Sequence, residues 1–450
     1  MTPELQPVAL LSTSAPAPRR PHALMALIGR GECDPASVTE AEQAGLLHHA
    51  RQVEANMLAK IQDAAVNHGV RAARRAIARY HEKLAVRFYH LWQSTPPKHR
   101  PQTSLSEAEN EARRISRLQG VFDRRERIAR WAPSEARLTT RQKPDGEHRP
   151  IFRFGWTEQA RFRLFKSALE PFAGFHASQF QFAVNARDRG SQAACKAMLE
   201  ALNSLVGMTT PIGPNQAEDY VFLELDVEDF FGSIGEEWWG TKPVLDGRLK
   251  EILYTDYLTV KASRRVRDRL SGAFFHPSRR GLPQGSALSA LIAEWVMADV
   301  LKGVPALSDD VFLFVYCDNI GVLAPRERIG AIEELIRTAF RAAGAGAFNL
   351  KDKSGRGAVP VTRPFRFLGM EFCAAGGRAA ISVNDHAVAL ATLDIGNELL
   401  MAQTHAQFDL IRRKVRGKAS SWKLWSGARP WEEMMANTID DAQSAQAGAH

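Results

Sequence analysis

The sequence predicts an α+β protein in which a strand-containing centre is flanked by helical segments. Residues 34–132 carry apolar side chains at helical spacing, as in RAARRAIARYHEKLAVRFYHLW. Between Leu138 and Phe372, short strand-like runs such as VFLELDV and VFLFVY alternate with helical stretches. From Ser382 onward the pattern is helical again. A chain of 450 residues has the length for two or three packed subdomains, and we place their boundaries at 33, 132 and 381.

The first 33 residues predict a disordered leader, because they are rich in Pro, Ala and Ser. Glu4 and the basic residues after the short apolar run make a poor signal peptide. No stretch approaches the roughly 20 apolar residues that span a bilayer. The four cysteines have no paired spacing, so neither a disulfide framework nor a zinc site is indicated. We therefore expect a soluble, cytoplasmic protein that does not bind membranes.

The charge balance indicates a polyanionic partner. The formal net charge is +9 and the pI is near 9.5. Lys and Arg side chains that neutralise phosphates release counterions, which favours nucleic-acid binding. The arginines of the N-terminal helical region either follow a phosphate backbone or solvate a helix face.

Two aspartates occupy positions suited to metal binding. Asp226 ends the apolar run of VFLELDVEDFFGSI, and DDVFLFVYCDNIGVLAP predicts a hairpin with Asp318 and Asn319 at its tip. Two carboxylates that meet over one surface can hold Mg²⁺, which prefers oxygen ligands. Nucleotidyl transfer needs such a pair, with two ions about 4 Å apart. Taken singly, each aspartate is more often a cap or a turn residue.

A third segment, SRRGLPQGSALSALIAEWVMADVL, lies between the two aspartates. It predicts a turn followed by a helix, in which Gly281 and Gly285 let the backbone approach a bulky ligand closely. As a turn and a helix start, this segment alone would be unremarkable. Its order and spacing relative to Asp226 and Asp318 make it a more specific sign of a functional site.

Seven blocks in order resemble those of bacterial reverse transcriptases. They are KPDGEHRPIFRF, the pair ALEPF and QFAVNARDRGSQAAC, LDVEDFFGSI, GLPQGSALS, YCDN, NLKDKSG and FRFLGMEF, and they cover roughly residues 138–375. The resemblance implies a right-hand polymerase with fingers, an antiparallel-sheet palm and a helical thumb that begins near Ser382. It also implies an RNA-directed DNA polymerase that adds dNTPs to a nucleic-acid primer on an RNA template.

The same resemblance implies roles for individual residues. Metal ions would be held by Asp226, Val227 and Asp318, and Asn319 and Lys353 would complete the catalytic group, with Lys351 an almost equal candidate for the lysine. Incoming nucleotide would be bound by Lys143, Arg149, Phe231 and Gln284. Among these, Phe231 would clash with a ribose 2′-hydroxyl, provided that the chain leaves its strand after Asp226. Phe367, Leu368 and Gly369 would form a hairpin that grips the primer, although FLG is also common in ordinary strands and turns.

Asn319 departs from the family pattern, which has two adjacent aspartates at this tip. An amide oxygen still coordinates a hard cation, but it removes one negative charge, so we expect weaker metal binding and activity that is reduced or shifted towards Mn²⁺. Two other functions stay open: an RNA-directed RNA polymerase of viral type, and a catalytically weak palm domain that binds RNA. The absence of a nuclease segment makes a self-contained mobile element a poor fit. The short thumb and the helical N-terminal extension resemble those of stand-alone bacterial enzymes of the retron-like or phage-defence type, the latter by analogy alone.

The C-terminal region has a basic cluster followed by tryptophans. Two hypotheses fit it: contacts to a duplex backbone with base stacking, or a solvated helix face above core tryptophans. The cluster consists of Arg412, Arg413, Lys414, Arg416 and Lys418, with Trp422 and Trp425 nearby. The last residues, AQSAQAGAH, are expected to be frayed.

Overall fold

A computed structural model places most of the chain. It describes residues 18–102, 105–129, 135–142, 148–176, 178–183, 190–207, 216–242, 251, 253–254, 259–262, 281–305 and 307–448. Within these residues, no helix combines the length and the apolar character that crossing a bilayer requires.

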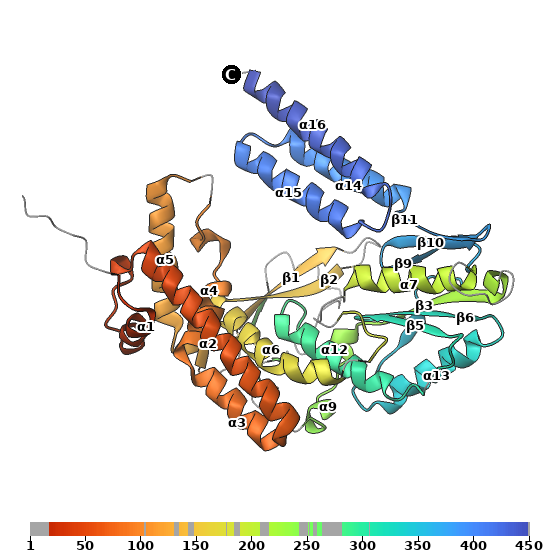
Figure 1. The fold of residues 1–450 in the computed structure, drawn as a ribbon, viewed down its shortest axis with the longest axis horizontal. Helices are drawn as coiled ribbons and strands as arrows, with labels where there is room; N and C mark the ends of the chain where they lie inside the picture. The colour runs from red at the N-terminus through yellow and green to blue at the C-terminus, as the bar shows by residue number, and fades with distance from the viewer. Residues whose placement is uncertain are drawn as a thin grey trace, which may run out of the picture.

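Five helices form the N-terminal unit at the left of Figure 1. They are α1 (Pro21–Arg30), α2 (Glu40–Asn67), α3 (Gly69–Glu82), α4 (Leu84–Gln93) and α5 (Glu107–Arg124). Capping boxes start α2, through Thr39 and Glu42, and α5, through Ser106 and Glu109. Arg71, Arg75 and Arg79 lie exposed along α3.

The expectation of a disordered leader up to residue 33 is wrong for α1. This helix buries Leu24, Met25 and Ile28, and it ends at Gly31, which has a left-handed φ of 77°. Burial of three apolar side chains against the other helices outweighs the Pro- and Ala-rich composition on which the expectation rested.

A small sheet follows the helical unit, in the strand order β2–β1–β4. β1 (Glu135–Gln142) and β2 (His148–Phe154) pair antiparallel, and β4 (Thr259–Ala262) joins β1 in parallel. After β2 the chain enters α6 (Trp156–His176), which packs on the N-terminal helices and on α12 (Ala287–Leu301).

The central sheet has five strands in the order β5–β6–β3–β7, with β8 also paired to β3. All its pairings are antiparallel. The strands are β3 (Tyr220–Val227), β5 (Phe312–Tyr316), β6 (Asn319–Pro325), β7 (Leu350–Asp352) and β8 (Val359–Pro360). The α+β class expected from the sequence is therefore confirmed.

Side chains alternate between the two faces of β3, and each face belongs to a different apolar core. Leu223, Leu225 and Val227 join one apolar core with α6, α12, α13 (Ile329–Ala342) and the N-terminal helices. Tyr220 and Phe222 point to the other face and join a second core, which includes α7 (Ser191–Leu205). The central sheet thus lies between two cores.

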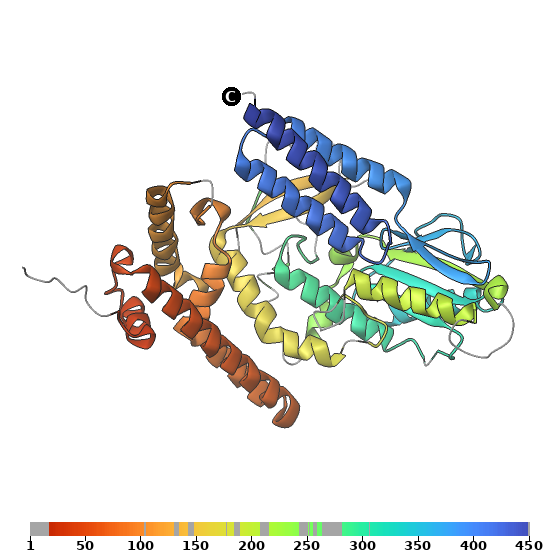
Figure 2. The same ribbon diagram turned by 45° about the horizontal axis from the view of Figure 1, so that its top comes forward.

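The second core continues into the C-terminal region, which forms a separate layer in Figures 1 and 2. A three-stranded antiparallel sheet comes first, and three helices follow it. They are β9 (Phe365–Phe367), β10 (Met370–Ala375), β11 (Arg378–Ser382), α14 (Asp385–Leu400), α15 (His405–Ser421) and α16 (Ala428–Gly448). The expected fraying of the last residues is wrong up to residue 448, because α16 continues to that point.

Candidate active site

Asp226 lies at the open end of β3. Because side chains alternate along a strand, Phe222, Glu224 and Asp226 share one face. The side chain of Glu224 is 11% exposed and that of Asp226 is 21% exposed. Exposure of this face therefore increases towards the end of the strand. Asp226 pairs directly with Asn319 of β6 on one side and with Lys351 of β7 on the other.

The tip of the β5–β6 hairpin brings Asp318 to the same end of the sheet. The turn is only two residues long, Cys317 and Asp318, and Cys317 adopts a left-handed φ of 55°. The backbone N–H of Val227 donates to the carbonyl oxygen of Asp318 at 3.2 Å. The Asn319 amide donates to Asp318 Oδ1, also at 3.2 Å. Asp226, Val227, Asp318 and Asn319 are therefore neighbours, although more than 90 residues separate the two strands in sequence.

Lys353, not Lys351, points at this group. Its ammonium donates to Asn319 Oδ1 and lies 3.3 Å from Glu224 Oε1 and 3.7 Å from Asp226 Oδ1. Lys351 instead lies 3.4 Å from Glu228 Oε1, farther along the chain after β3. The sequence left Lys351 and Lys353 almost equal as candidates for the catalytic lysine. The contacts favour Lys353.

Phe231 lies where the chain turns away from β3. The strand ends at Val227, Asp229 has a left-handed φ of 44°, and the short helix α8 (Phe230–Ser233) follows. This is the departure from the strand that a gate at Phe231 requires. The Phe231 ring is half-buried and packs against the edge of Phe230, and its carbonyl accepts a hydrogen bond of 2.8 Å from Leu282 N–H.

Gln284 joins the loop before α12 to the small sheet. Its carbonyl accepts a 2.7 Å hydrogen bond from the N–H of Phe152 in β2. Gln284, whose side chain is half-buried, therefore lies on a loop whose backbone is bonded both to β2 and, through Leu282, to Phe231.

Gly281 and Gly285 serve a different purpose from the one that the sequence suggested. A Cβ on Gly281 would lie 2.6 Å from Gly232, and a Cβ on Gly285 would lie 2.3 Å from the carbonyl oxygen of Phe152. Both residues have positive φ, of 138° and 114°. The expectation of close approach to a ligand is thus replaced by close approach to the chain's own backbone, which fixes the loop against α8 and β2.

The remaining predicted residues fall partly outside the described chain. Lys143 lies outside the described residues. Arg149 belongs to β2 and pairs with Arg141 of β1, but its side chain also lies outside them. Leu368 and Gly369, both with positive φ, form the two-residue turn between β9 and β10, and Phe367 is buried against Phe222 and Phe314.

Sequence reasoning missed Glu224. Burial raises the pKa of its carboxyl group above the ordinary value, and the nearby charge of Lys353 opposes that shift. The signal was present, because Glu224 interrupts an apolar strand two residues before Asp226 and so must face the same way.

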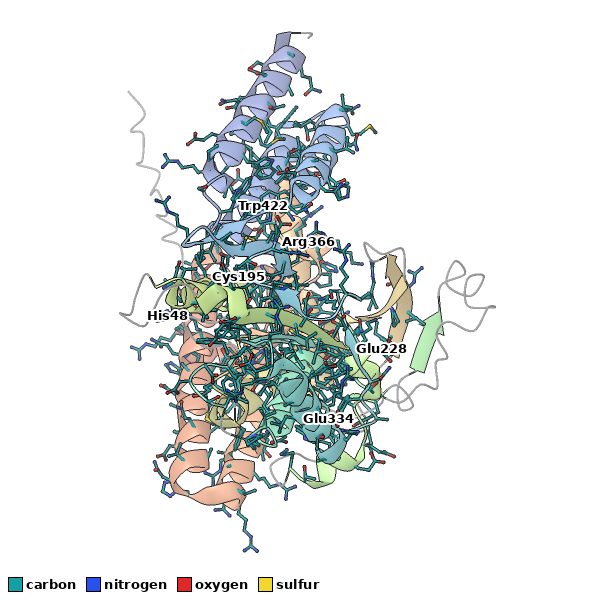
Figure 3. All side chains as sticks on the ribbon, turned by 90° about the vertical axis from the view of Figure 1, so that its right-hand side faces the viewer. His48, Cys195, Glu228, Glu334, Arg366 and Trp422 are labelled. Carbon is teal, nitrogen blue, oxygen red and sulfur yellow. The ribbon has the colours of Figure 1, made fainter. Side chains whose placement is uncertain are left out.

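Of the two tryptophans near the basic cluster, Trp422 is a core residue and Trp425 is partly buried against the same core. Trp422 is 5% exposed and packs against Trp425 and Trp431. Figure 3 labels Trp422 among the C-terminal helices. Lys418 covers the Trp422 ring at 4.8 Å. The stacking hypothesis is therefore wrong for Trp422, whereas Arg413 and Arg416 remain exposed on α15.

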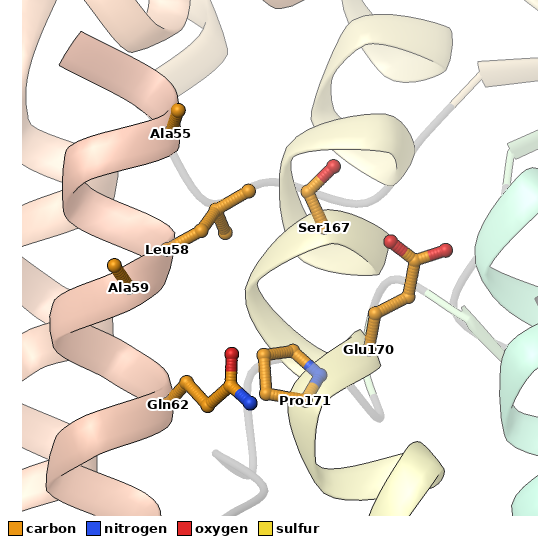
Figure 4. A pocket seen from close by; sticks show the side chains of 7 residues that line it. All are labelled: Ala55, Leu58, Ala59, Gln62, Ser167, Glu170 and Pro171. Carbon is orange, nitrogen blue, oxygen red and sulfur yellow. The ribbon is translucent and has the colours of Figure 1, made fainter. Parts of the chain in front are cut away.

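A cavity of about 650 Å³ lies between α2 and α6 (Figure 4). None of the residues predicted from the sequence lines it. Its walls are Ala55, Leu58, Ala59 and Gln62 from α2, and Ser167, Glu170 and Pro171 from α6. The candidate active site is instead the end of the central sheet.

The oxygen donors at that end suit a hard divalent cation. Asp226 and Asp318 offer carboxylates, Asn319 offers an amide oxygen, and three of the site's oxygens already surround the Lys353 ammonium. Among the described residues, no group of three or more His, Cys, Asp or Glu side chains forms a ready-made metal cluster.

Together, an antiparallel sheet with two aspartates at its open end and a glycine-anchored loop beside them define a polymerase palm. The family described as reverse transcriptase (RNA-dependent DNA polymerase) matches residues 142–372, just over half of the chain. The chain belongs to this reverse transcriptase family. A search of curated proteins finds no match.

Proposed function

We propose that this protein is an RNA-directed DNA polymerase that adds dNTPs to a primer by two-metal nucleotidyl transfer. One observation carries the proposal: the antiparallel pairing of β3 and β6 brings Asp226 beside the Asp318–Asn319 tip. Membership of the reverse transcriptase family supports it. The narrower assignment to stand-alone bacterial enzymes of the retron-like or phage-defence type rests on the sequence resemblance alone.

Asp226 and Asp318, with the backbone of Val227, would hold two divalent ions, Mg²⁺ or Mn²⁺. Bound ions of this kind activate an attacking hydroxyl and stabilise a leaving pyrophosphate. The protein's own side chains would position the ions and the nucleotide. The sheet holds the two carboxylates at its end, and Lys353 supplies positive charge next to them, where the phosphates of a nucleotide would lie.

The surrounding elements would receive the nucleic acid. We assign the β1–β2 hairpin, with Lys143 and Arg149, to the fingers that hold the triphosphate. Gln284 would lie near the nascent base pair, the β9–β10 turn would contact the primer, and α14–α16 would form the thumb. The net charge of +9 supports a polyanionic template and primer.

Primer extension on an RNA template tests the proposal. The full-length protein is given dNTPs or NTPs in Mg²⁺ and in Mn²⁺, with Asp318→Ala as the inactive control and Asp309→Ala, an aspartate away from the site, as the matched control. We expect dNTP incorporation by the wild type and by Asp309→Ala, and at least about 100-fold less by Asp318→Ala.

The other functions predict different results. Preferential incorporation of NTPs would assign the protein to the RNA-directed RNA polymerases. No incorporation with any primer or metal, together with retained RNA binding, would favour the catalytically weak palm domain that Asn319 suggests.

A further inference from the structure

The Lys353 ammonium marks the place on the sheet where oxygen donors converge on a cation. Glu224 Oε1 lies 3.3 Å from it and Asp226 Oδ1 lies 3.7 Å from it, while Asn319 Oδ1 accepts its hydrogen bond. The two carboxylate oxygens that share this ammonium are therefore no more than 7.0 Å apart. Charges at such a separation interact appreciably in a partly buried site.

Aromatic rings of the second core fill the space opposite Glu224. The residue directly opposite it on β6 is Gly321, which has no side chain. A Cβ on Gly321 would lie only 3.0 Å from the rings of Phe222 and Phe367, so this position has no space for another side chain. The Glu224 backbone carbonyl also accepts a 2.9 Å hydrogen bond from Lys353 N–H, which fixes the two residues side by side.

A mostly buried carboxylate is costly unless it is paired, and an apolar residue would suit this strand. The observed partner of the Glu224 carboxylate is the Lys353 ammonium, 3.3 Å away. Asn319 has a neutral amide, so the tip itself carries only the charge of Asp318. In the family pattern, Asp226 and two adjacent aspartates would give three carboxylates. Here Glu224, Asp226 and Asp318 give the same number near this end of the sheet.

We propose that Glu224 supplies the negative charge that Asn319 lacks, and that it thereby sets the affinity of the site for divalent cations. Glu224 is a positioning residue that acts through Lys353 and through its field, while Asp226 and Asp318 contact the ions. This inference rests on the proposed function, because it assumes that those two aspartates bind metal.

Binding of Mn²⁺ to the full-length protein, without nucleic acid, measures this directly by electron paramagnetic resonance. Glu224→Gln is expected to weaken the Mn²⁺ binding that depends on Asp318 by about tenfold. Adding Asn319→Asp to that variant should restore the affinity to within about threefold of the wild type, because a carboxylate returns to the site. The gain in Mn²⁺ affinity from Asn319→Asp should be larger in the Glu224→Gln background than in the wild type, and equal gains in both backgrounds would mean that Glu224 does not stand in for the missing carboxylate.

Glu228→Gln is the matched control. Glu228 lies two residues beyond Asp226, as Glu224 lies two residues before it, but its side chain is 45% exposed and contacts Lys351 and Asn349. We expect its removal to change Mn²⁺ affinity by less than about twofold, because water screens an exposed charge.

The outcomes separate this inference from the proposed function. Equal Mn²⁺ affinity of the wild type and Glu224→Gln, with loss in Asp318→Ala, would overturn the inference alone. Mn²⁺ binding that Asp318→Ala does not reduce would overturn the metal site itself. If Glu224→Gln does not fold, Glu224→Leu takes its place, because an apolar residue suits this strand: about tenfold weaker Mn²⁺ binding is expected, and an affinity equal to that of the wild type would refute the inference.

Discussion

Phe231 shows how one residue's position depends on a local break in secondary structure. A continued strand would alternate its side chains and direct Phe231 away from Asp226. Instead β3 stops at Val227, and the left-handed conformation of Asp229 starts a short helix. The Phe231 backbone is then held by Leu282, in the loop that also carries Gln284.

Replacement of Phe231 by Ala should relax the choice of sugar. In the proposed polymerase, the Phe231 ring would clash with a ribose 2′-hydroxyl, so its loss should lower the preference for dNTPs over NTPs by about 10- to 200-fold. The ratio of kcat/KM for the matching dNTP and NTP in primer extension measures this. Phe231→Tyr keeps the ring and should keep the preference. An unchanged ratio in Phe231→Ala, with dNTP incorporation intact, would exclude a gate at this residue.

At this scale, the sequence predicts a residue's position where that position depends on a single strand or turn. Asp226 lies near the end of β3 and Asp318 in the β5–β6 turn, as the sequence pattern predicted, because a strand end and a hairpin tip are visible in the sequence. Glu224 and the two loop glycines were missed or misassigned for the opposite reason. Their roles depend on Lys353, Gly232 and Phe152, which approach them only in the folded chain.

For whole helices and strands, too, the sequence predicts what depends on local pattern and not what depends on tertiary contacts. The strands of the central sheet follow from short apolar runs, but α1 was hidden by a composition typical of disorder, and its stability comes from contacts with other helices. In the C-terminal layer, the sequence left the basic cluster and the tryptophans open between two hypotheses. Burial decides for Trp422, because a side chain that fills the contact between α15 and α16 cannot also stack on a base.

The substitution Trp422→Ala should therefore destabilise the C-terminal helices. Loss of a buried indole that packs on two other tryptophans costs about 3–5 kcal/mol. Chemical denaturation followed by circular dichroism measures the change in the free energy of unfolding. Arg413→Ala, an exposed change on the same helix, should alter it by less than about 0.5 kcal/mol. Unaltered stability of Trp422→Ala, with weaker RNA binding, would return this residue to a stacking role.

At the scale of the molecule, the central sheet links the two cores. One face of β3 belongs to the core of the N-terminal helices, and the other belongs to the core that includes α14–α16. No local sequence pattern reveals this sharing, because it depends on how elements far apart in the chain pack on one sheet. A sheet covered on both faces has little freedom to unfold while either core stays intact.

Unfolding of the two cores should therefore be coupled, and Trp422→Ala provides the test. Hydrogen exchange with mass spectrometry compares amide protection in β3 and β6 with that in α15 and α16. If the layers unfold together, the free energy lost in α15 should appear equally in β3, although Trp422 does not belong to that strand. Exposed Arg413→Ala should leave both regions unchanged. Faster exchange confined to α14–α16 would mean that the C-terminal layer opens independently, and that it can move relative to Asp226 and Asp318 without unfolding the sheet that holds them.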